Sequence, residues 1–189
     1  MSLQPRENDR DFRPSLKTIN FSYLNVNKST AALTELQITR PRDIIYFISE
    51  VPLRDNHPIP LEGFYSIYAE TDPSNTIRTC TYFRESAADC LESFDCHPDY
   101  VTIKLVDQWS ITACYIDPLS DIPSSLLKPL TDRQILIGDF NAKHQSWFDI
   151  RPTDSSISKK RGLTLFKWAN KYHLVERGPR EPTRYQTGF

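Results

Sequence analysis

The sequence predicts an α+β fold in which helices cover layered β-strands. The run DIIYFISEVP combines β-branched and aromatic residues without polar alternation, as is typical of a strand that is covered on both faces. Several short β-rich pieces lie between Gly63 and Tyr115, whereas apolar residues recur at helical spacing in two other segments. Strands and helices in this mixed order indicate an α+β layered sandwich.

The first elements are a strand and a short helix. A β-prone run, TINFSYL, begins at Thr18, and the period then changes in NKSTAALTELQ. Ser29 or Thr30 is a suitable N-cap, and Leu33 and Leu36 would face inward. Pro41 ends this segment before the buried strand DIIYFISEVP begins.

The middle and the end of the chain continue the pattern of strands and one more helix. The close spacing of FYSIYAE, TIRTCTYFRE, DYVTIKLV and SITACYI predicts antiparallel neighbours. DPLSDIPSSLLKPL has room for only a short helix, and QILIG reads as a buried strand. After a polar loop, DIRPTDSSISKKR, a second helix is predicted in GLTLFKWANKYHLV from the spacing of Leu165, Trp168, Ala169 and Tyr172.

Composition limits the class of protein. The 189 residues suit one domain, predicted here as residues 18–189 after a flexible arm of residues 1–17. The 23 Lys and Arg nearly balance the 24 Asp and Glu, so no global positive field would attract a nucleic acid, and an anionic substrate needs a local site.

Cysteine usage and hydropathy predict the cellular setting. The four cysteines contain no CxxC pair, and a chain of this length needs no disulfide staples, which favours an intracellular, reduced protein. No apolar run approaches the roughly 20 residues that span a bilayer, so no membrane is expected as a partner.

Polar side chains follow four of the predicted strands at the point where each strand ends. They are Asn25, Glu50, Tyr115, and the pair Asp139 and Asn141. The carboxyl ends of neighbouring parallel strands meet at one edge of a sheet, where pockets usually form, so these side chains could converge. Each residue alone also fits a simpler role as a turn former or a helix cap.

The string GDFNAKH at residues 138–144, followed by Trp147, resembles the GDFNAxH...W motif of the endonuclease/exonuclease/phosphatase superfamily. The likeness is greatest to the endonuclease domain of non-LTR (LINE-type) retrotransposons. YLNVNKSTAALTEL, DIIYFISEVP, ITACYIDPLSDI and RGLTLFKWANKYHLV followed by PTR resemble other segments of that family in its own order. The resemblance implies a DNase I-like, four-layer α/β/β/α sandwich of two mixed β-sheets.

The resemblance also implies a phosphodiester-cleaving site. Glu50 would be the principal ligand of Mg²⁺ (or Mn²⁺), with Asn25 beside it on the metal or its waters. Asp139 would deprotonate the attacking water, and Asn141 would bond to a phosphate oxygen or align Asp139. Tyr115 would donate its hydroxyl to the phosphate or to the leaving group.

Other residues have weaker assignments. In the resembling motif His144 lies near the site rather than in it, and its simpler interpretation is a loop histidine that bonds to backbone. The basic run SKKRG offers Lys159, Lys160 and Arg161 as contacts to DNA phosphates.

The resemblance is incomplete at the C-terminal end. The superfamily closes its site with a Ser-Asp-His element, and no SDH string occurs in this sequence. The expectation is therefore a C-terminally incomplete domain, whose exposed sheet a further segment or a partner protein would complete.

Three functions remain open. The first is a metal-dependent DNA endonuclease, weakened or inactive if the C-terminal histidine is lost, that acts in the nucleus beside a reverse transcriptase region of the same polyprotein. The second is a non-catalytic remnant that binds nucleic acid or protein, and the third is another phosphoesterase of the same superfamily.

Overall fold

The structure, a computed structural model, describes residues 18–69, 77–147 and 151–175. The predicted arm of residues 1–17 and the PTR string lie outside the described residues.

The chain forms two compact units, each with its own internal contacts. Unit 1 comprises Met1–Tyr115 and Arg133–Gly138. Unit 2 comprises Ile116–Asp132 and Asp139–Phe189.

The first sheet of unit 1 is mixed and has the strand order β1-β2-β6-β5. Its strands are β1 (Phe21–Asn25), β2 (Ile45–Ser49), β5 (Phe64–Ile67) and β6 (Thr79–Arg84). β1 and β2 run parallel, so that Asn25 pairs with Ser49 at their carboxyl ends, whereas β6 is antiparallel to both β2 and β5. The predicted strand that is covered on both faces is confirmed, because every residue of β2 is buried.

The second sheet of unit 1 has the order β10-β9-β8-β7. Its strands are β7 (Leu91–His97), β8 (Tyr100–Leu105), β9 (Ser110–Tyr115) and β10 (Gln134–Asp139). β7, β8 and β9 are antiparallel neighbours. The backbone of Ser110 bonds to Arg133 at one end, and Gly138 lies against Cys114 at the other, so β9 and β10 run parallel.

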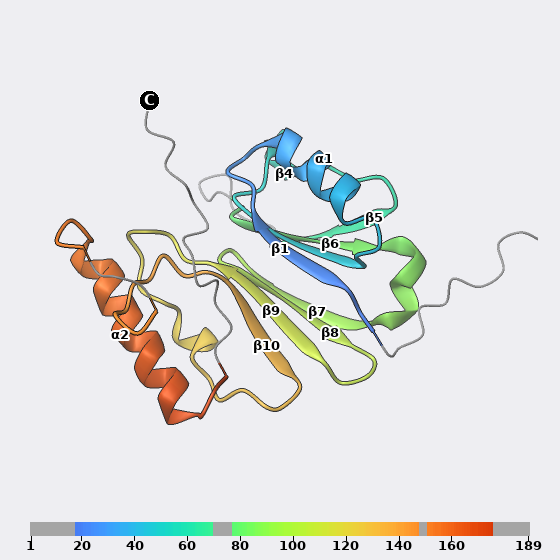
Figure 1. Cartoon of the computed structure of the whole chain (residues 1–189). Helices are drawn as coiled ribbons and strands as arrows, with labels where there is room; N and C mark the ends of the chain where they lie inside the picture. Colours follow the sequence, from blue (N-terminus) through green and yellow to red (C-terminus); the bar gives the residue numbers. More distant parts are fainter. Residues whose placement is uncertain (1–17, 70–76, 148–150, 176–189) are drawn as a thin grey trace, which may run out of the picture. The chain divides into compact units, whose positions relative to one another are not determined.

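Helix α1 (Thr30–Thr39) begins at the predicted cap, since the Ser29 side chain accepts a hydrogen bond from the amide of Ala32. Its inward residues Leu33 and Leu36 pack in one hydrophobic cluster with residues of β2 and β6, which include Tyr46 and Tyr82. The helix therefore covers one face of the first sheet, as Figure 1 also shows.

The opposite face of the first sheet packs against the second sheet. One cluster of buried side chains joins the two sheets and includes Phe47, Phe83, Ile67, Val101, Ile103, Ile111 and Ala113. Unit 1 thus has three layers, α/β/β, and the predicted α+β class is confirmed. Burial raises the pKa of the Cys80 thiol and the Tyr82 hydroxyl, so both groups stay protonated in this core.

A small two-stranded hairpin, β3 (Leu53–Arg54) and β4 (His57–Pro58), follows the first sheet's β2. Asp55 and Asn56 both have positive φ in its turn, as the two central residues of a type I′ turn do. A 3₁₀ segment, η1 (Glu85–Cys90), connects the two sheets. The sequence did not predict this hairpin or β7, whose side chains are mostly exposed.

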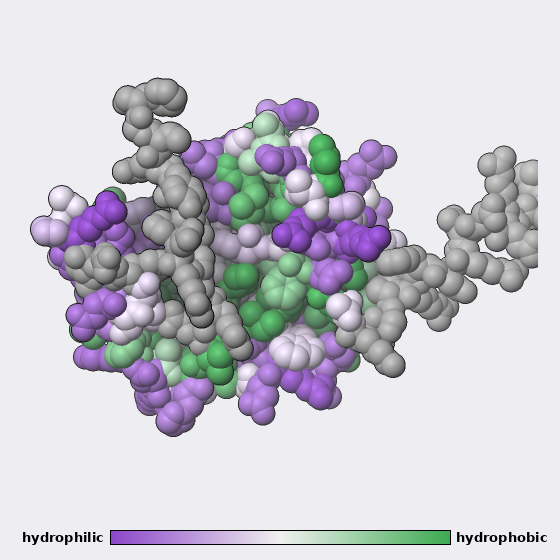
Figure 2. Space-filling view, in the orientation of Figure 1, coloured by the Kyte–Doolittle hydropathy of each residue, from purple (hydrophilic) through white to green (hydrophobic). Residues whose placement is uncertain are grey.

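Unit 2 contains the short helix η2 (Ser124–Leu126), as predicted, and helix α2 (Ser156–Lys171). The prediction that Ser156–Arg161 belong to a polar loop is wrong. The side chain of Ser155 caps the helix by accepting from the amide of Ser158, and the first helical turns bury Ser158 and Arg161. Figure 2 shows hydrophilic side chains gathered over α2.

None of the helices within the described ranges is long and apolar enough to cross a bilayer. The four cysteines all lie within the described ranges and are free thiols.

Candidate active site

Asn25 and Glu50 come together at the carboxyl ends of the parallel strands β1 and β2. Asn25 is the last residue of β1, Glu50 follows β2 directly, and the side-chain amide Nδ2 of Asn25 donates to Oε1 of Glu50 over 2.7 Å. The amide oxygen of Asn25 accepts from the backbone of Asn27 over 2.9 Å. The amide of Asn25 therefore orients the carboxylate of Glu50.

The backbone of Glu50 is held in a conformation that few glutamates adopt. Its φ is 48°, in the left-handed region, which costs a non-glycine residue about 1–2 kcal/mol. Its N–H donates to the carbonyl of Arg78 over 2.8 Å, and its own carbonyl accepts from the amide of Lys28 over 2.7 Å. Strain that neighbouring bonds maintain is common at functional sites.

Tyr115 ends β9 in the second sheet of unit 1. Its backbone N–H donates to the carbonyl of Asp99 over 2.9 Å, and the Asp99 carboxylate forms an ion pair with Arg78 at 2.6 Å. Arg78 in turn accepts from the backbone of Glu50, so a short series of contacts connects the strand end of Glu50 with that of Tyr115. No sequence pattern indicated Arg78 or Asp99 as site residues, because neither follows a predicted strand.

Asp139 and Asn141 form a tight turn in unit 2. The amide of Asn141 donates to Oδ1 of Asp139 over 3.0 Å, and the Asn141 side chain donates to the carbonyl of Ile116 over 2.9 Å. Ile116 also donates its amide to the carbonyl of Asp139 over 2.9 Å. Asn141 has a φ of 44°, a left-handed value that asparagine tolerates better than most residues. Its local bonds thus fix the Asp139 carboxylate.

His144 lies in an aromatic cluster of unit 2. Its ring stacks on Phe166 of α2, with centroids 4.1 Å apart, and lies 5.5 Å from the ring of Trp147. Its Nδ1 accepts from the backbone of Ser146 over 3.2 Å. These contacts support the interpretation of His144 as a loop histidine that bonds to backbone.

The loop before His144 is tied to a polar turn nearby. The ammonium of Lys143 hydrogen-bonds to Asp154, which holds the pKa of that carboxyl below its usual value. The amide of Lys143 donates to the carbonyl of Ser158 in α2 over 3.0 Å. This loop is therefore fixed to the first turn of the helix.

Arg161 is not available as a contact to DNA, which corrects the prediction for this residue. It is 2% exposed, and its guanidinium donates to the carbonyls of Asp117 (2.7 Å), Pro118 (2.9 Å) and Ser120 (3.2 Å). The cation thus holds the loop that follows β9. Lys160 is exposed and pairs with Asp121, whereas Lys159 is partly buried.

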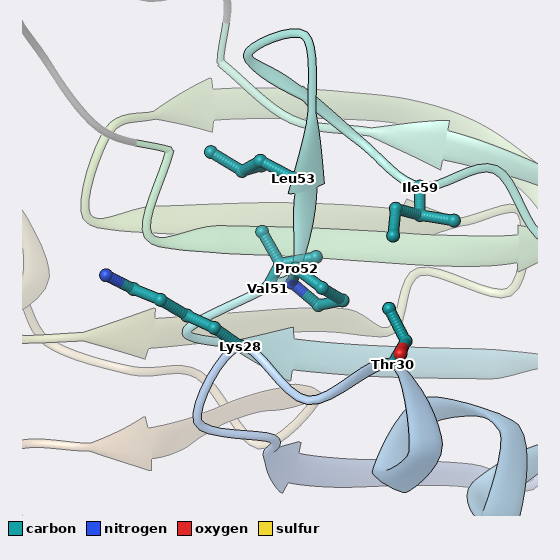
Figure 3. Close-up of a pocket in the computed structure, with 6 residues that line it drawn as sticks. All are labelled: Lys28, Thr30, Val51, Pro52, Leu53 and Ile59. Atoms are coloured by element: carbon teal, nitrogen blue, oxygen red, sulfur yellow. The ribbon is translucent and has the colours of Figure 1, made fainter.

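A shallow pocket of about 290 Å³ opens beside Glu50 in unit 1. It is lined by Lys28, Thr30, Val51, Pro52, Leu53 and Ile59. In Figure 3 the long side chain of Lys28 extends to the left, away from Thr30 and Ile59, and Val51 and Pro52 lie near the centre of the view.

The oxygen atoms of Glu50 and Asn25 have the chemistry that Mg²⁺ prefers, since this ion binds one or two carboxylates and keeps several waters. Across the described ranges, no three His, Cys, Asp or Glu side chains gather into a metal-binding group. A site of the magnesium type does not require such a group, so these residues fit this ion better than zinc.

The structure thus brings the predicted residues together in two local groups. Asn25 and Glu50 are in contact in unit 1, where Tyr115 also lies, and Asp139 and Asn141 are in contact in unit 2. Each group is built on strand ends, as the sequence predicted.

An α+β fold with carboxylate and amide side chains at the ends of its strands is consistent with a nuclease-type domain. Residues 109–188 match the family described as "Endonuclease-reverse transcriptase". The match confirms the resemblance to a retrotransposon-like domain of the endonuclease/exonuclease/phosphatase type, and the matched range contains Tyr115, Asp139 and Asn141. A comparison with curated proteins found no match to this chain.

Proposed function

We propose that the protein is a metal-dependent endonuclease that hydrolyses phosphodiester bonds in DNA. The observation that carries this proposal is the contact between Asn25 and Glu50 at the ends of two parallel strands. A carboxylate that is oriented by an amide, and held by a constrained backbone, is a suitable ligand for a hard cation.

Glu50 would hold Mg²⁺, or Mn²⁺, through its carboxylate. Asn25 would keep this carboxylate in position and lie close to the waters of the metal. When bound, the cation would supply the positive charge that a phosphodiester needs as its own negative charge increases.

Asp139 would accept a proton from the attacking water. The hydrogen bond from the amide of Asn141 keeps one oxygen of this carboxylate in place, while the other oxygen is the one that would take the proton. Of the two predicted roles of Asn141, these bonds favour the alignment of Asp139. The side chain of Asn141 has a second N–H that could still donate to a phosphate oxygen.

Tyr115 would donate its hydroxyl to the phosphate or to the leaving oxygen. Such a donor stabilises the charge that develops as the bond breaks. Lys28, at the rim of the pocket beside Glu50, and Lys160, on the exposed face of α2, are the cations that we propose as contacts to DNA phosphates.

The family match supports an origin in a retroelement. We therefore propose that the substrate is the chromosomal target site, that the cleavage takes place in the nucleus, and that a reverse transcriptase region of the same polyprotein uses the nick. A partner that completes the sheet belongs to the same proposal.

The substrate class can be tested by offering the protein supercoiled plasmid and a small phosphate monoester in parallel. With Mg²⁺ we expect nicked plasmid and no release of inorganic phosphate from the monoester, and with EDTA we expect neither product. Release of phosphate without nicking would instead support a phosphatase of the same superfamily.

Absence of both products would favour the second function, a non-catalytic module that binds nucleic acid or protein. That module would still retain plasmid in a gel-shift assay at low salt, because phosphate contacts weaken steeply as salt increases.

A further inference from the structure

The ion pair between Arg78 and Asp99 joins the two sheets of unit 1 beside the candidate active site. Arg78 directly precedes β6 of the first sheet, and Asp99 lies in the turn between β7 and β8 of the second. Nη1 of Arg78 and Oδ1 of Asp99 are 2.6 Å apart. Their side chains are 32% and 19% exposed, so water screens the pair only in part.

Each member of this pair also holds the backbone of one proposed catalytic residue. The carbonyl of Arg78 accepts from the amide of Glu50 over 2.8 Å. The carbonyl of Asp99 accepts from the amide of Tyr115 over 2.9 Å. Asp99 therefore lies directly next to Tyr115, and Arg78 lies directly next to Glu50.

Two further hydrogen bonds hold the backbone of Asp99 in place. Its carbonyl also accepts from the hydroxyl of Thr79 over 3.4 Å, and its amide donates to Nδ1 of His97 over 3.2 Å. The turn that carries Asp99 is thus tied both to β6 and to the end of β7.

We propose that Arg78 and Asp99 are positioning residues, which set the separation between the carboxylate of Glu50 and the hydroxyl of Tyr115. This inference rests on the proposed function. If Glu50 holds the cation and Tyr115 contacts the phosphate, the two sheets must keep these two groups at a fixed distance. The ion pair is a direct polar connection between the two strand ends. Water still screens this pair in part, so its contribution to stability is expected to be modest and its main effect is expected on catalysis.

The test uses Arg78→Met, Asp99→Asn and the double variant in the full chain. We expect each single variant to lower kcat for plasmid nicking by about 10- to 100-fold, as is typical when groups that orient a ligand are lost. The Kd for DNA should stay within twofold of wild type, and the double variant should be no slower than the slower single variant, because both changes break one interaction.

A second readout does not depend on cleavage. Mn²⁺ binding, followed by electron paramagnetic resonance, should require Glu50 and should weaken by about tenfold in Arg78→Met. Circular dichroism would show that each variant is folded, and Asp99→Asn keeps the size of the side chain. The exposed ion pair of Lys160 and Asp121 in unit 2 offers the control, since Asp121→Asn breaks this pair and should leave kcat unchanged.

The outcomes separate the two proposals. Unchanged kcat and Mn²⁺ affinity in both single variants would overturn the positioning role. So would a weaker Kd for DNA in Arg78→Met at constant kcat, which would make Arg78 a direct phosphate contact. A wild-type protein that neither nicks plasmid nor binds Mn²⁺ through Glu50 would overturn the proposed function and this inference with it.

Discussion

Glu50→Gln is expected to lower Mg²⁺-dependent nicking of plasmid by about 10²- to 10⁴-fold. The substitution keeps the size of the side chain and its acceptor for the amide of Asn25, but it removes the negative charge that attracts the cation. The fold should therefore remain intact while Mn²⁺ binding is lost. The measurement is a time course of nicked plasmid, together with Mn²⁺ binding to the same protein samples.

A matched control for this change is Glu62→Gln. Glu62 is an exposed glutamate of the same unit, so the same chemical change there should leave both nicking and Mn²⁺ binding as in wild type. Equal activity of Glu50→Gln and wild type would mean that the carboxylate of Glu50 has no part in the reaction.

Gly162→Ala is expected to destabilise unit 2 by about 3 kcal/mol. A Cβ at this position of α2 would lie 1.9 Å from the carbonyl oxygen and 2.3 Å from the carbonyl carbon of Lys143. These are backbone atoms of the loop that carries His144, and they cannot move aside as the end of a flexible side chain can. The measurement is a urea unfolding curve at constant pH.

Whether Gly162→Ala lowers or raises the free energy of unfolding shows which is larger, the packing clash or the gain in helix propensity. Alanine favours a helix over glycine by about 1 kcal/mol, so propensity alone predicts that Gly162→Ala stabilises the protein. Leu163→Ala, at the neighbouring exposed position of the same helix, provides the comparison and should change the unfolding midpoint little. A rise in stability on Gly162→Ala would show that α2 does not pack on the backbone of Lys143.

The elements that were predicted correctly are those whose buried residues form a recognisable pattern within a short stretch of sequence. β2 is apolar throughout, and α1 shows both its cap at Ser29 and its inward Leu33 and Leu36. β7 was missed because this edge strand exposes most of its side chains, so it carries no apolar alternation.

Contacts that are distant in sequence could not be predicted in the same way. Arg161 appeared to be one cation of an exposed basic run, but the carbonyls of Asp117, Pro118 and Ser120, about 40 residues earlier, bury it. The same limit applies to Arg78 and Asp99, which become neighbours only when the two sheets pack together.

The candidate site was partly accessible to the sequence, because strand ends place polar residues at the edge of a sheet. That rule anticipated the contact between Asn25 and Glu50 and the local bonds between Asp139 and Asn141. The amide oxygen of Asn25 accepts a hydrogen bond from the backbone of Asn27, which helps to orient its Nδ2 toward Glu50. This orientation could not be predicted from the residue types alone.

The most direct measurement is the initial rate of plasmid nicking with Mg²⁺ by the wild-type protein, by Asp139→Asn and by Asp132→Asn, which makes the same change at an exposed aspartate. We expect metal-dependent nicking by the wild type, a loss of about 10²- to 10⁴-fold in Asp139→Asn, where the proton acceptor is removed, and little change in Asp132→Asn. Equal rates for Asp139→Asn and the wild type would show that the carboxylate of Asp139 is not the proton acceptor of the reaction.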